Sequence, residues 1–206
     1  MFQLLRKEGI PHVLLDRRFK GFASHFVGVN DEFLGYVATR HLIEIGCQRI
    51  AHISAAELSP LVGRLEGYKR ALAEYGLVLG PEYVTGTGRA EEVRESAGYD
   101  AVNELLRVSP RPDAIFCFND HVAMGAMRAI LDAGLRIPTD IALLGCGNFH
   151  FDDYLRVSLG GMDQQSAAID SSRIVLGRTG RSDFTSLIAS RAARMPKLIR
   201  RDSTRR

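Results

Sequence analysis

Two asparagines occupy positions that suit hydrogen bonding to a small polar ligand. Asn119 directly follows an apolar run over residues 113–118, and Asn148 follows a second run over residues 141–144 and a short glycine-containing turn. An amide side chain both donates and accepts hydrogen bonds, which polyols and nucleobases require from a binding site. The alternative for Asn119 is a structural role as the cap of the following helix, and the two roles are compatible.

The elements around these asparagines form one βαβ unit. Residues 113–118 predict a buried strand, and apolar residues at helical spacing then predict a helix that ends at Gly134, shortly before Pro138. Residues 141–144 predict the second strand. A right-handed crossover makes such strands parallel, and ligands bind beyond the carboxyl ends of parallel strands, where both asparagines are expected.

The same alternation continues along the chain. The expected helices cover residues 1–9, 31–46, 59–76, 95–108, 120–134 and 167–176, and the expected strands cover 10–15, 26–29, 49–54, 82–85, 113–118, 141–144, 157–162 and 197–201. Helices that end at a glycine are repeatedly followed by an apolar run. This pattern predicts an α/β fold with a parallel sheet and helices on both of its faces.

Composition places the chain among ordinary globular proteins. It has 206 residues, of which 46% are hydrophobic and 25% are charged. No apolar run approaches the roughly 20 residues that span a bilayer, and the N-terminus lacks the pattern of a secretory signal. We therefore expect a cytoplasmic protein without membrane contact.

The residues that usually carry catalysis do not form a recognisable set. The sequence contains no G-x-S-x-G, no P-loop, no H-E-x-x-H and no dinucleotide-binding glycine motif, and its six histidines lack metal-ligand spacing. Cys146 has no neighbouring base to activate it, and the three cysteines are expected to be buried reduced thiols. We expect neither an enzyme, a metal site nor a cofactor.

A longer stretch around the two asparagines resembles a known family. The segment FNDHVAMGAMRAILDAGLRIPTDIALLGCGN is similar to LacI/GalR-family transcription regulators, in which Asn-Asp opens a helix, GL-R-[IV]-P-x-D follows, and a strand leads to G-[FY]-D-[DN]. The likeness runs from about Ile10 to Gln164, and KLIRRDSTRR is similar to the family's closing strand. It implies a periplasmic-binding-protein-like (type I) fold with two lobes.

The resemblance also implies how the chain is divided. Residues 27–162 correspond to a complete C-terminal lobe, which residues 196–201 close with a last strand. Residues 1–26 and 163–195 correspond to parts of an incomplete N-terminal lobe. The family's DNA-binding helix-turn-helix head has no counterpart in these 206 residues.

The resemblance further implies four polar contacts to an effector. They are Asn119, Asn148, Asp16 at the end of an expected strand, and Arg64, which matches the arginine of G/A-R-x-x-G-[FYW]. A guanidinium with carboxylate and amide groups at strand ends supplies the converging donors and acceptors that a polyol needs. Alternatively, Arg64 pairs with Glu57 or Glu66 on the surface, and Asp16 is an ordinary turn residue.

The loop before Asn148 departs from the family. Gly147 stands where the family usually has an aspartate, so a carboxylate that accepts hydrogen bonds from sugar hydroxyls is missing there. Phe118, Phe149 and Phe151 are close enough in sequence to form an apolar or stacking wall of the site. The alternative is that these phenylalanines belong to the core.

Family dimers imply a second surface. The expected interface residues lie on the helix after Asn119 and in the turn after the glycine-rich loop; they are Met124, Met127, Arg128, Leu131, Tyr154 and Leu155. The methionines alternatively belong to the core. The implied function is sensing of a sugar-like effector for a homodimeric regulator that contacts DNA only through the missing head; the alternative is a solute-binding protein of a sugar transporter.

Three further features are assigned structural roles. Asp120 is interpreted as a first-turn acid that the helix dipole favours, and Asp152-Asp153 as a solvated turn. From Arg173 onward the chain has ten Lys/Arg against two Asp/Glu, a balance of +8. We expect this basic segment to be a solvated terminus rather than a phosphate-binding one, because no aromatic pattern accompanies the charge.

Overall fold

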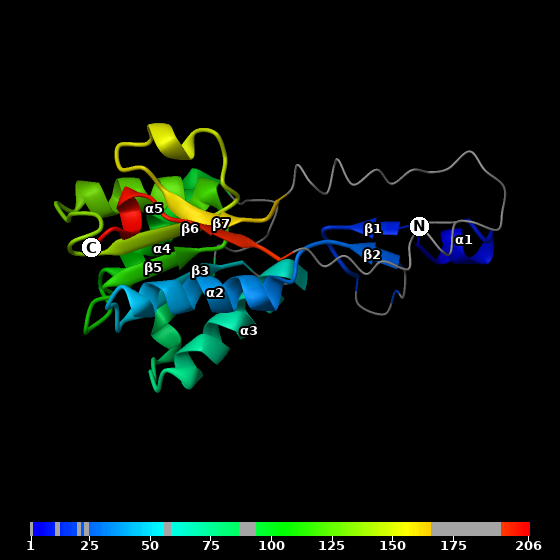
Figure 1. Ribbon diagram of the computed structural model, residues 1–206, viewed down its shortest axis with the longest axis horizontal. Coiled ribbons are helices and arrows are strands. Elements are labelled where there is room, and N and C mark those ends of the chain that lie inside the picture. Colours follow the sequence, from blue (N-terminus) through cyan, green and yellow to red (C-terminus); the bar gives the residue numbers. More distant parts are fainter. Residues whose placement is uncertain are drawn as a thin grey trace.

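A six-stranded sheet is the centre of the computed structural model, which describes residues 2–10, 13–19, 22, 25–55, 59–86, 94–165 and 195–206 (Figure 1). Its order is β4-β3-β5-β6-β7-β8, with bounds β3 Ile50–Ser54, β4 Val84–Gly86, β5 Ala114–Cys117, β6 Ala142–Cys146, β7 Gly160–Asp163 and β8 Lys197–Ile199. All neighbouring pairs are parallel except β7 and β8. The predicted parallel α/β sheet is confirmed.

Helices cover both faces of this sheet. Figure 1 shows α2 (Asp31–Glu44) and α3 (Ser59–Glu74) on one side, and α4 (Glu95–Leu105) and α5 (Asp120–Asp132) on the other. Successive strand residues point to opposite faces, so β5 contributes Ile115 to the core under α4 and α5 and Phe116 to the core under α2 and α3. Strands buried on both sides explain the apolar runs of the sequence.

The helices begin and end where the sequence indicates. The side chain of Asn30 accepts a hydrogen bond from Phe33 N at 3.0 Å and caps α2, and Asn119 caps α5 in the same way. Gly46 and Gly134, just beyond the ends of α2 and α5, have φ of +93° and +73°. None of the helices in the described residues is long and apolar enough to cross a membrane.

A smaller parallel pair of strands precedes the six-stranded sheet. It consists of β1 (Val13–Leu15) and β2 (His25–Val27), with the short helix α1 (Phe2–Lys7) before them. Figure 1 shows this pair apart from the large sheet. The expected helix over 167–176 and most of the expected lobe segment 163–195 lie outside the described residues.

The C-terminal turn packs against the large sheet, so the prediction of a solvated terminus is wrong for Ser203 and Thr204, whereas the basic residues Lys197, Arg200, Arg205 and Arg206 are exposed. Ser203 is fully buried, and its hydroxyl donates to Leu143 O at 2.7 Å and accepts from Gly160 N at 2.8 Å. It belongs to a single turn over Asp202–Thr204 that follows β8. The polar residues around Ser203 in the sequence did not indicate that its hydroxyl would bridge β6 and β7.

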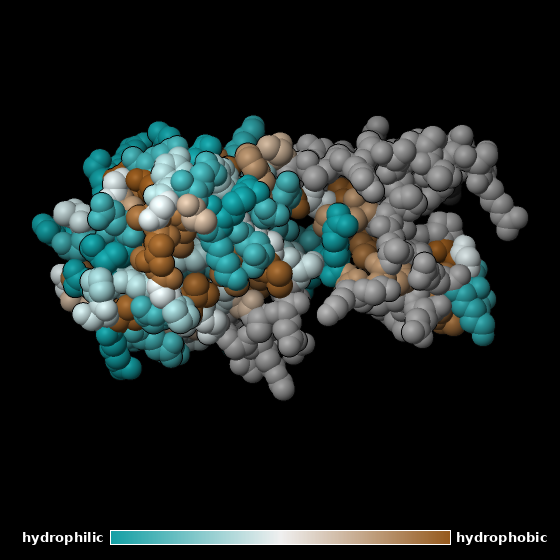
Figure 2. Space-filling view, turned by 90° about the horizontal axis from the view of Figure 1, so that it is seen from below, coloured by the Kyte–Doolittle hydropathy of each residue, from teal (hydrophilic) through white to brown (hydrophobic). Residues whose placement is uncertain are grey.

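Figure 2 shows one face of the molecule, on which apolar residues form small groups among polar ones. The exposed large apolar side chains come from separate elements and include Val62, Tyr75 and Val78. Single exposed apolar residues of this kind are normal for a folded protein. The apolar surface of the chain is therefore concentrated in the two layers under the helices.

Candidate functional site

Arg64 lies at the centre of the candidate site. It is in the early turns of α3 and only 5% exposed. Its Nε donates to Asp31 Oδ1 at 3.0 Å, Nη1 to Phe118 O at 2.6 Å and Nη2 to Gln164 Oε1 at 3.1 Å. One guanidinium thus joins the start of α2 with the segments that follow β5 and β7.

The alternative of a surface pair between Arg64 and Glu66 is wrong. Glu66 Oε1 pairs instead with Lys69 Nζ at 3.0 Å, and both side chains are more than half exposed. The other surface partner considered for Arg64, Glu57, lies outside the described residues. Three protein acceptors hold the buried guanidinium of Arg64 in one orientation, because each hydrogen bond restricts the rotamer of the side chain.

Glycines bring α2 and α3 close enough for this arrangement. A Cβ at Gly67 would lie 2.0 Å from Glu32 O, and one at Gly35 would lie 2.1 Å from Arg64 O. Neither distance is possible for a real side chain, so only glycine permits the two backbones to approach here. The close approach places Arg64 beside Asp31.

The electrostatics of the site favour a charged arginine beside a desolvated acid. Burial raises the pKa of Asp31 to about 6, although the nearby Arg64 guanidinium opposes the shift and Asp16 adds slightly to it. Asp16 therefore lies within electrostatic range of this pair. Its backbone is in the left-handed region at φ +64°, and its side chain, 60% exposed, pairs with Arg17 at 3.6 Å.

Asn119 does act as a helix cap. Its Oδ1 accepts a hydrogen bond from Val122 N at 2.8 Å. Within the described part of the chain, the NH₂ group of Asn119 donates no hydrogen bond. It is therefore able to donate one to a ligand. The ring of the preceding Phe118 is 5% exposed and packs in the core, so the core interpretation holds for this ring, while the carbonyl of Phe118 faces Arg64.

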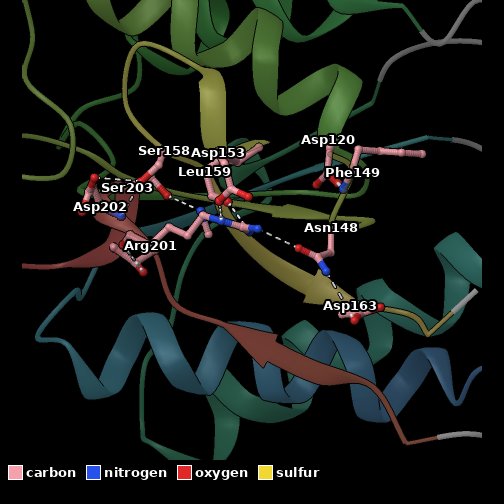
Figure 3. A network of polar contacts seen from close by, with 12 residues as sticks. Asp120, Asn148, Phe149, Asp153, Ser158, Leu159, Asp163, Arg201, Asp202 and Ser203 are labelled. Carbon is pink, nitrogen blue, oxygen red and sulfur yellow. Dashed lines mark hydrogen bonds and ion pairs between the residues drawn. The ribbon is translucent and has the colours of Figure 1, made fainter. Parts of the chain in front are cut away.

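Asn148 belongs to a second polar network (Figure 3). It follows β6 with φ +58°, its Oδ1 accepts from Arg201 Nη2 at 2.9 Å, and its Nδ2 donates to Asp163 Oδ2 at 3.4 Å. Arg201 also donates to Leu159 O at 2.9 Å and pairs with Asp153. The network meets the Arg64 cluster through β7, because Gln164 directly follows Asp163.

An aromatic group flanks this network. Phe149 is 44% exposed, and its ring stacks on that of Phe151 with centroids 5.4 Å apart. Both rings contact His121, whose Nδ1 lies 2.9 Å from Glu95 Oε1. The core interpretation is therefore wrong for Phe149, and an aromatic surface is available to stack against a ligand.

Two acids of this region are buried, contrary to the sequence interpretation. Asp120 and Asp152 have no exposed surface, so Asp120 is not simply a first-turn acid and Asp152 does not lie in a solvated turn. Burial raises the pKa of both groups, that of Asp152 to about 7, and the nearby charge of Asp120 adds to the shift of Asp152. Asp120 Oδ2 also accepts from Phe149 N at 3.3 Å. The acid pair anchors the loop that carries Asn148.

The expected dimer residues gather on one surface. A shallow depression is lined by Met124, Met127, Arg128, Leu131, Asp132, Leu155 and Arg156. Tyr154 is 87% exposed beside Leu155, whereas Met127 is only 4% exposed and packs in the core. The core interpretation is therefore correct for Met127, and the interface remains a prediction.

The reactive side chains of the described residues do not form an evident catalytic centre. Cys47, Cys117 and Cys146 are free and buried, as expected, and burial raises the pKa of the Cys146 thiol to about 12. Within the described ranges no three His, Cys, Asp or Glu side chains are grouped to hold a metal ion.

Sequence reasoning missed Asp31, Asp163, Gln164 and Arg201. Each lies in or beside a polar stretch without a motif, and their partners are distant in sequence. The only sequence signal for Arg201 was its place in KLIRRDSTRR, which resembled a closing strand and not a binding group.

Comparison with known proteins identifies similar chains. A family described as periplasmic binding protein-like domain matches residues 39–204. The chain is 32% identical over 173 residues to the transcriptional repressor PurR of Photobacterium profundum, covering 83% of this chain and 50% of that protein. It is 38% identical over 152 residues to the regulator GalR of Escherichia coli, covering 73% and 42%. The chain thus spans about half the length of these relatives.

Solved structures agree with these relatives. A LacI-family regulatory protein from Chloroflexus aggregans superposes with a TM-score of 0.82 and 28% identity, covering 98% of this chain and 71% of that one. A complex of the regulator CelR with cellobiose gives 0.81 and 25%, covering 98% and 61%. A LacI-family regulator from Enterococcus faecium with bound ribose shares the fold at 0.75 and 24%, covering 98% and 73%.

Proposed function

Since the chain belongs to the periplasmic binding protein-like family, as the effector-binding region of a LacI/GalR-type regulator, we propose that it senses a small polar effector. Residues 27–162, closed by 196–201, form the C-terminal lobe, and residues 1–26 and 163–195 contribute to an incomplete N-terminal lobe. Binding between the lobes changes their relative orientation, and a DNA-binding head in a longer protein responds to that change.

The observation that carries this proposal is the buried position of Arg64. Its guanidinium collects groups from α2 and from beyond β5 and β7, and Asn148 stands beyond β6. Ligands bind at these ends of strands in parallel sheets. Arg64, Asn119, Asn148 and Asp16 supply the polar contacts, and Phe149 supplies an apolar face.

The effector is sugar-like. Two similar regulators were solved with cellobiose and with ribose, which makes these sugars the first probes for this chain. Thermal-shift screening against sugars, sugar acids and nucleobases should find a compound that raises the melting temperature, because a ligand of the native state stabilises it. Arg64→Ala and Asn119→Ala should weaken the binding of that compound. Unchanged affinity in both variants would show that the site is elsewhere.

The chain forms a homodimer through the depression around Met124 and Leu131. Exposed Tyr154 and half-buried Leu155 extend this surface. Met124→Glu places a charge at its centre and should convert the dimer into a monomer in sedimentation velocity. Val62→Glu, at a more exposed apolar site on α3, should not. A monomeric wild-type chain would argue against this surface.

A further inference from the structure

We propose that Asp163 determines the specificity of the effector site by accepting hydrogen bonds from hydroxyl or ammonium groups of the effector, while Arg201 and Asn148 position it. This inference rests on the proposed function, because it assigns a ligand contact within the same site. At one end of that site, the effector carries groups that donate hydrogen bonds.

The charge of Asp163 lacks the arginine partner that Asp31 and Asp153 have. Asp31 pairs with Arg64 at 3.0 Å, and Asp153 pairs with Arg201. Asp163 is half-buried at the carboxyl end of β7, and no ion pair within the described part of the chain includes it. A partly desolvated carboxylate without a cation is stabilised by additional donors, which a ligand can provide.

The carboxylate of Asp163 is held in place and keeps acceptor capacity. Its Oδ1 accepts from Gln165 N at 2.6 Å, and its Oδ2 accepts from Asn148 Nδ2 at 3.4 Å. An ionised carboxylate offers about four acceptor positions, so two remain. Because it cannot donate, only a group that donates a hydrogen bond, such as a hydroxyl, amine or ammonium group, can bind there.

Arg201 determines which way the Asn148 amide points. A guanidinium only donates, so the oxygen of Asn148 must face Arg201, and the NH₂ group then faces Asp163 (Figure 3). Arg201 is itself restrained by Asp153 and by Leu159 O, and its side chain is 13% exposed. Arg201 is thus a positioning residue, one step removed from the ligand.

The neighbouring loop cannot provide the carboxylate itself. Gly147 lies beside β7, where its N donates to Met162 O at 3.0 Å. A Cβ on Gly147, where φ is +156°, would lie 2.4 Å from Asp120 Oδ2, so a side chain at this position would be strained and would displace the Asp120 carboxyl group. The acceptor at this edge therefore comes from Asp163 on the adjacent strand, one residue before the Gln164 that binds Arg64.

The test uses the 206-residue chain and isothermal titration with D-ribose, cellobiose, D-glucose, D-glucosamine and D-gluconate. Asp163→Asn should weaken the best-binding neutral or amino sugar about tenfold, the usual effect of losing a hydrogen bond to a charged group. Comparing D-glucose with D-glucosamine distinguishes hydroxyl from ammonium donors. D-gluconate should bind worse than D-glucose, and Asp163→Asn should reduce that preference because it removes the repelling charge.

Matched variants separate this contact from a general effect of charge. Asp100→Asn, an exposed acid on α4, changes the net charge equally and should leave all affinities unchanged. Arg201→Lys keeps the charge but loses the planar fork, so it should weaken the same sugar by less than Asp163→Asn and reduce the preference over D-gluconate in the same direction.

The outcomes distinguish this inference from the proposed function. If a sugar binds the wild-type chain and Asp163→Asn equally, but not Arg64→Ala, then the role of Asp163 is wrong and the effector site stands. If D-gluconate binds best and Asp163→Asn leaves its affinity unchanged, the role of Asp163 is also wrong. If none of the five compounds binds the wild-type chain, the role of Asp163 in binding a sugar is wrong, and the thermal-shift screen decides the proposed function separately.

Discussion

Two buried charged pairs near the carboxyl edge of the sheet differ in sign. Arg64 and Asp31 are opposite charges, whereas Asp120 and Asp152 are both acids. Above the raised pKa of Asp31, about 6, the first pair is ionised and fixes donors at the candidate site. The second is compatible with burial only when one carboxyl keeps its proton, and it fixes the loop beside the site. Similar burial therefore accompanies a proposed role in binding for one pair and a role in supporting the loop for the other.

Breaking the opposite-charge pair should have the largest effect. Arg64→Met keeps apolar volume but leaves Asp31 without its cation, and we expect a loss of about 3 kcal/mol in the free energy of unfolding. Urea denaturation measures this loss. Adding Asp31→Asn to Arg64→Met should recover part of it, because the unpaired charge is gone. If Arg64→Met were as stable as wild type, the ion pair between Arg64 and Asp31 would not stabilise the fold.

Separating α2 from α3 should have the next largest effect. Gly67→Ala puts a methyl group against Glu32 O, and the resulting strain should cost about 2 kcal/mol despite the better helix propensity of alanine. Affinity for an effector should fall as well, since Arg64 moves away from Asp31. Gly86→Ala, where nothing lies within 4 Å of the added atom, is the control and should change stability little. Gains in stability from Gly67→Ala would refute the close approach.

The acid pair should respond to pH in the direction of its raised pKa. The unfolded chain releases the Asp152 proton near pH 3.8, whereas the folded chain holds it to about pH 7. Between these values the folded state binds more protons, so this group's contribution to stability is full below pH 3.8 and declines as pH rises to 7. Asp152→Asn has no carboxyl group to titrate at this position, so it should be more stable than wild type between pH 5 and pH 8. Equal pH profiles for the two proteins would contradict the raised pKa of Asp152.

The smallest effect should come from the cap of α5, and it sharpens the assignment of Asn119. Asn119→Ala should lower the free energy of unfolding by about 1 kcal/mol through the lost bond to Val122 N. Asn119→Ser keeps a capping oxygen and should restore most of that stability. Thermal melts measure both variants. If Asn119→Ser also restores effector affinity, then Asn119 contributes to the site only as a cap.

Local patterns in the sequence determined the elements of this protein. The caps Asn30 and Asn119, the glycines that follow the helices and the apolar runs act over a few residues, so helices and strands were predictable to within a few positions. The position of Arg64 near the carboxyl ends of the strands was predictable from its motif together with the alternation of strands and helices. The lobe assignment and the ligand contacts remain proposals.

Only the tertiary structure determined which side chains pair with one another. Arg64 binds groups that are 33, 54 and 100 residues away, and Arg201 meets Asn148 across 53 residues. Such pairs depend on the order β4-β3-β5-β6-β7-β8, which brings the end of the chain beside β7. The burial of Asp152 has the same origin. An isolated Asp-Asp sequence indicates exposure, because desolvating a carboxylate is unfavourable. In the fold, burial raises the pKa of Asp152 to about 7, so the neutral form of its carboxyl group is favoured below that pH.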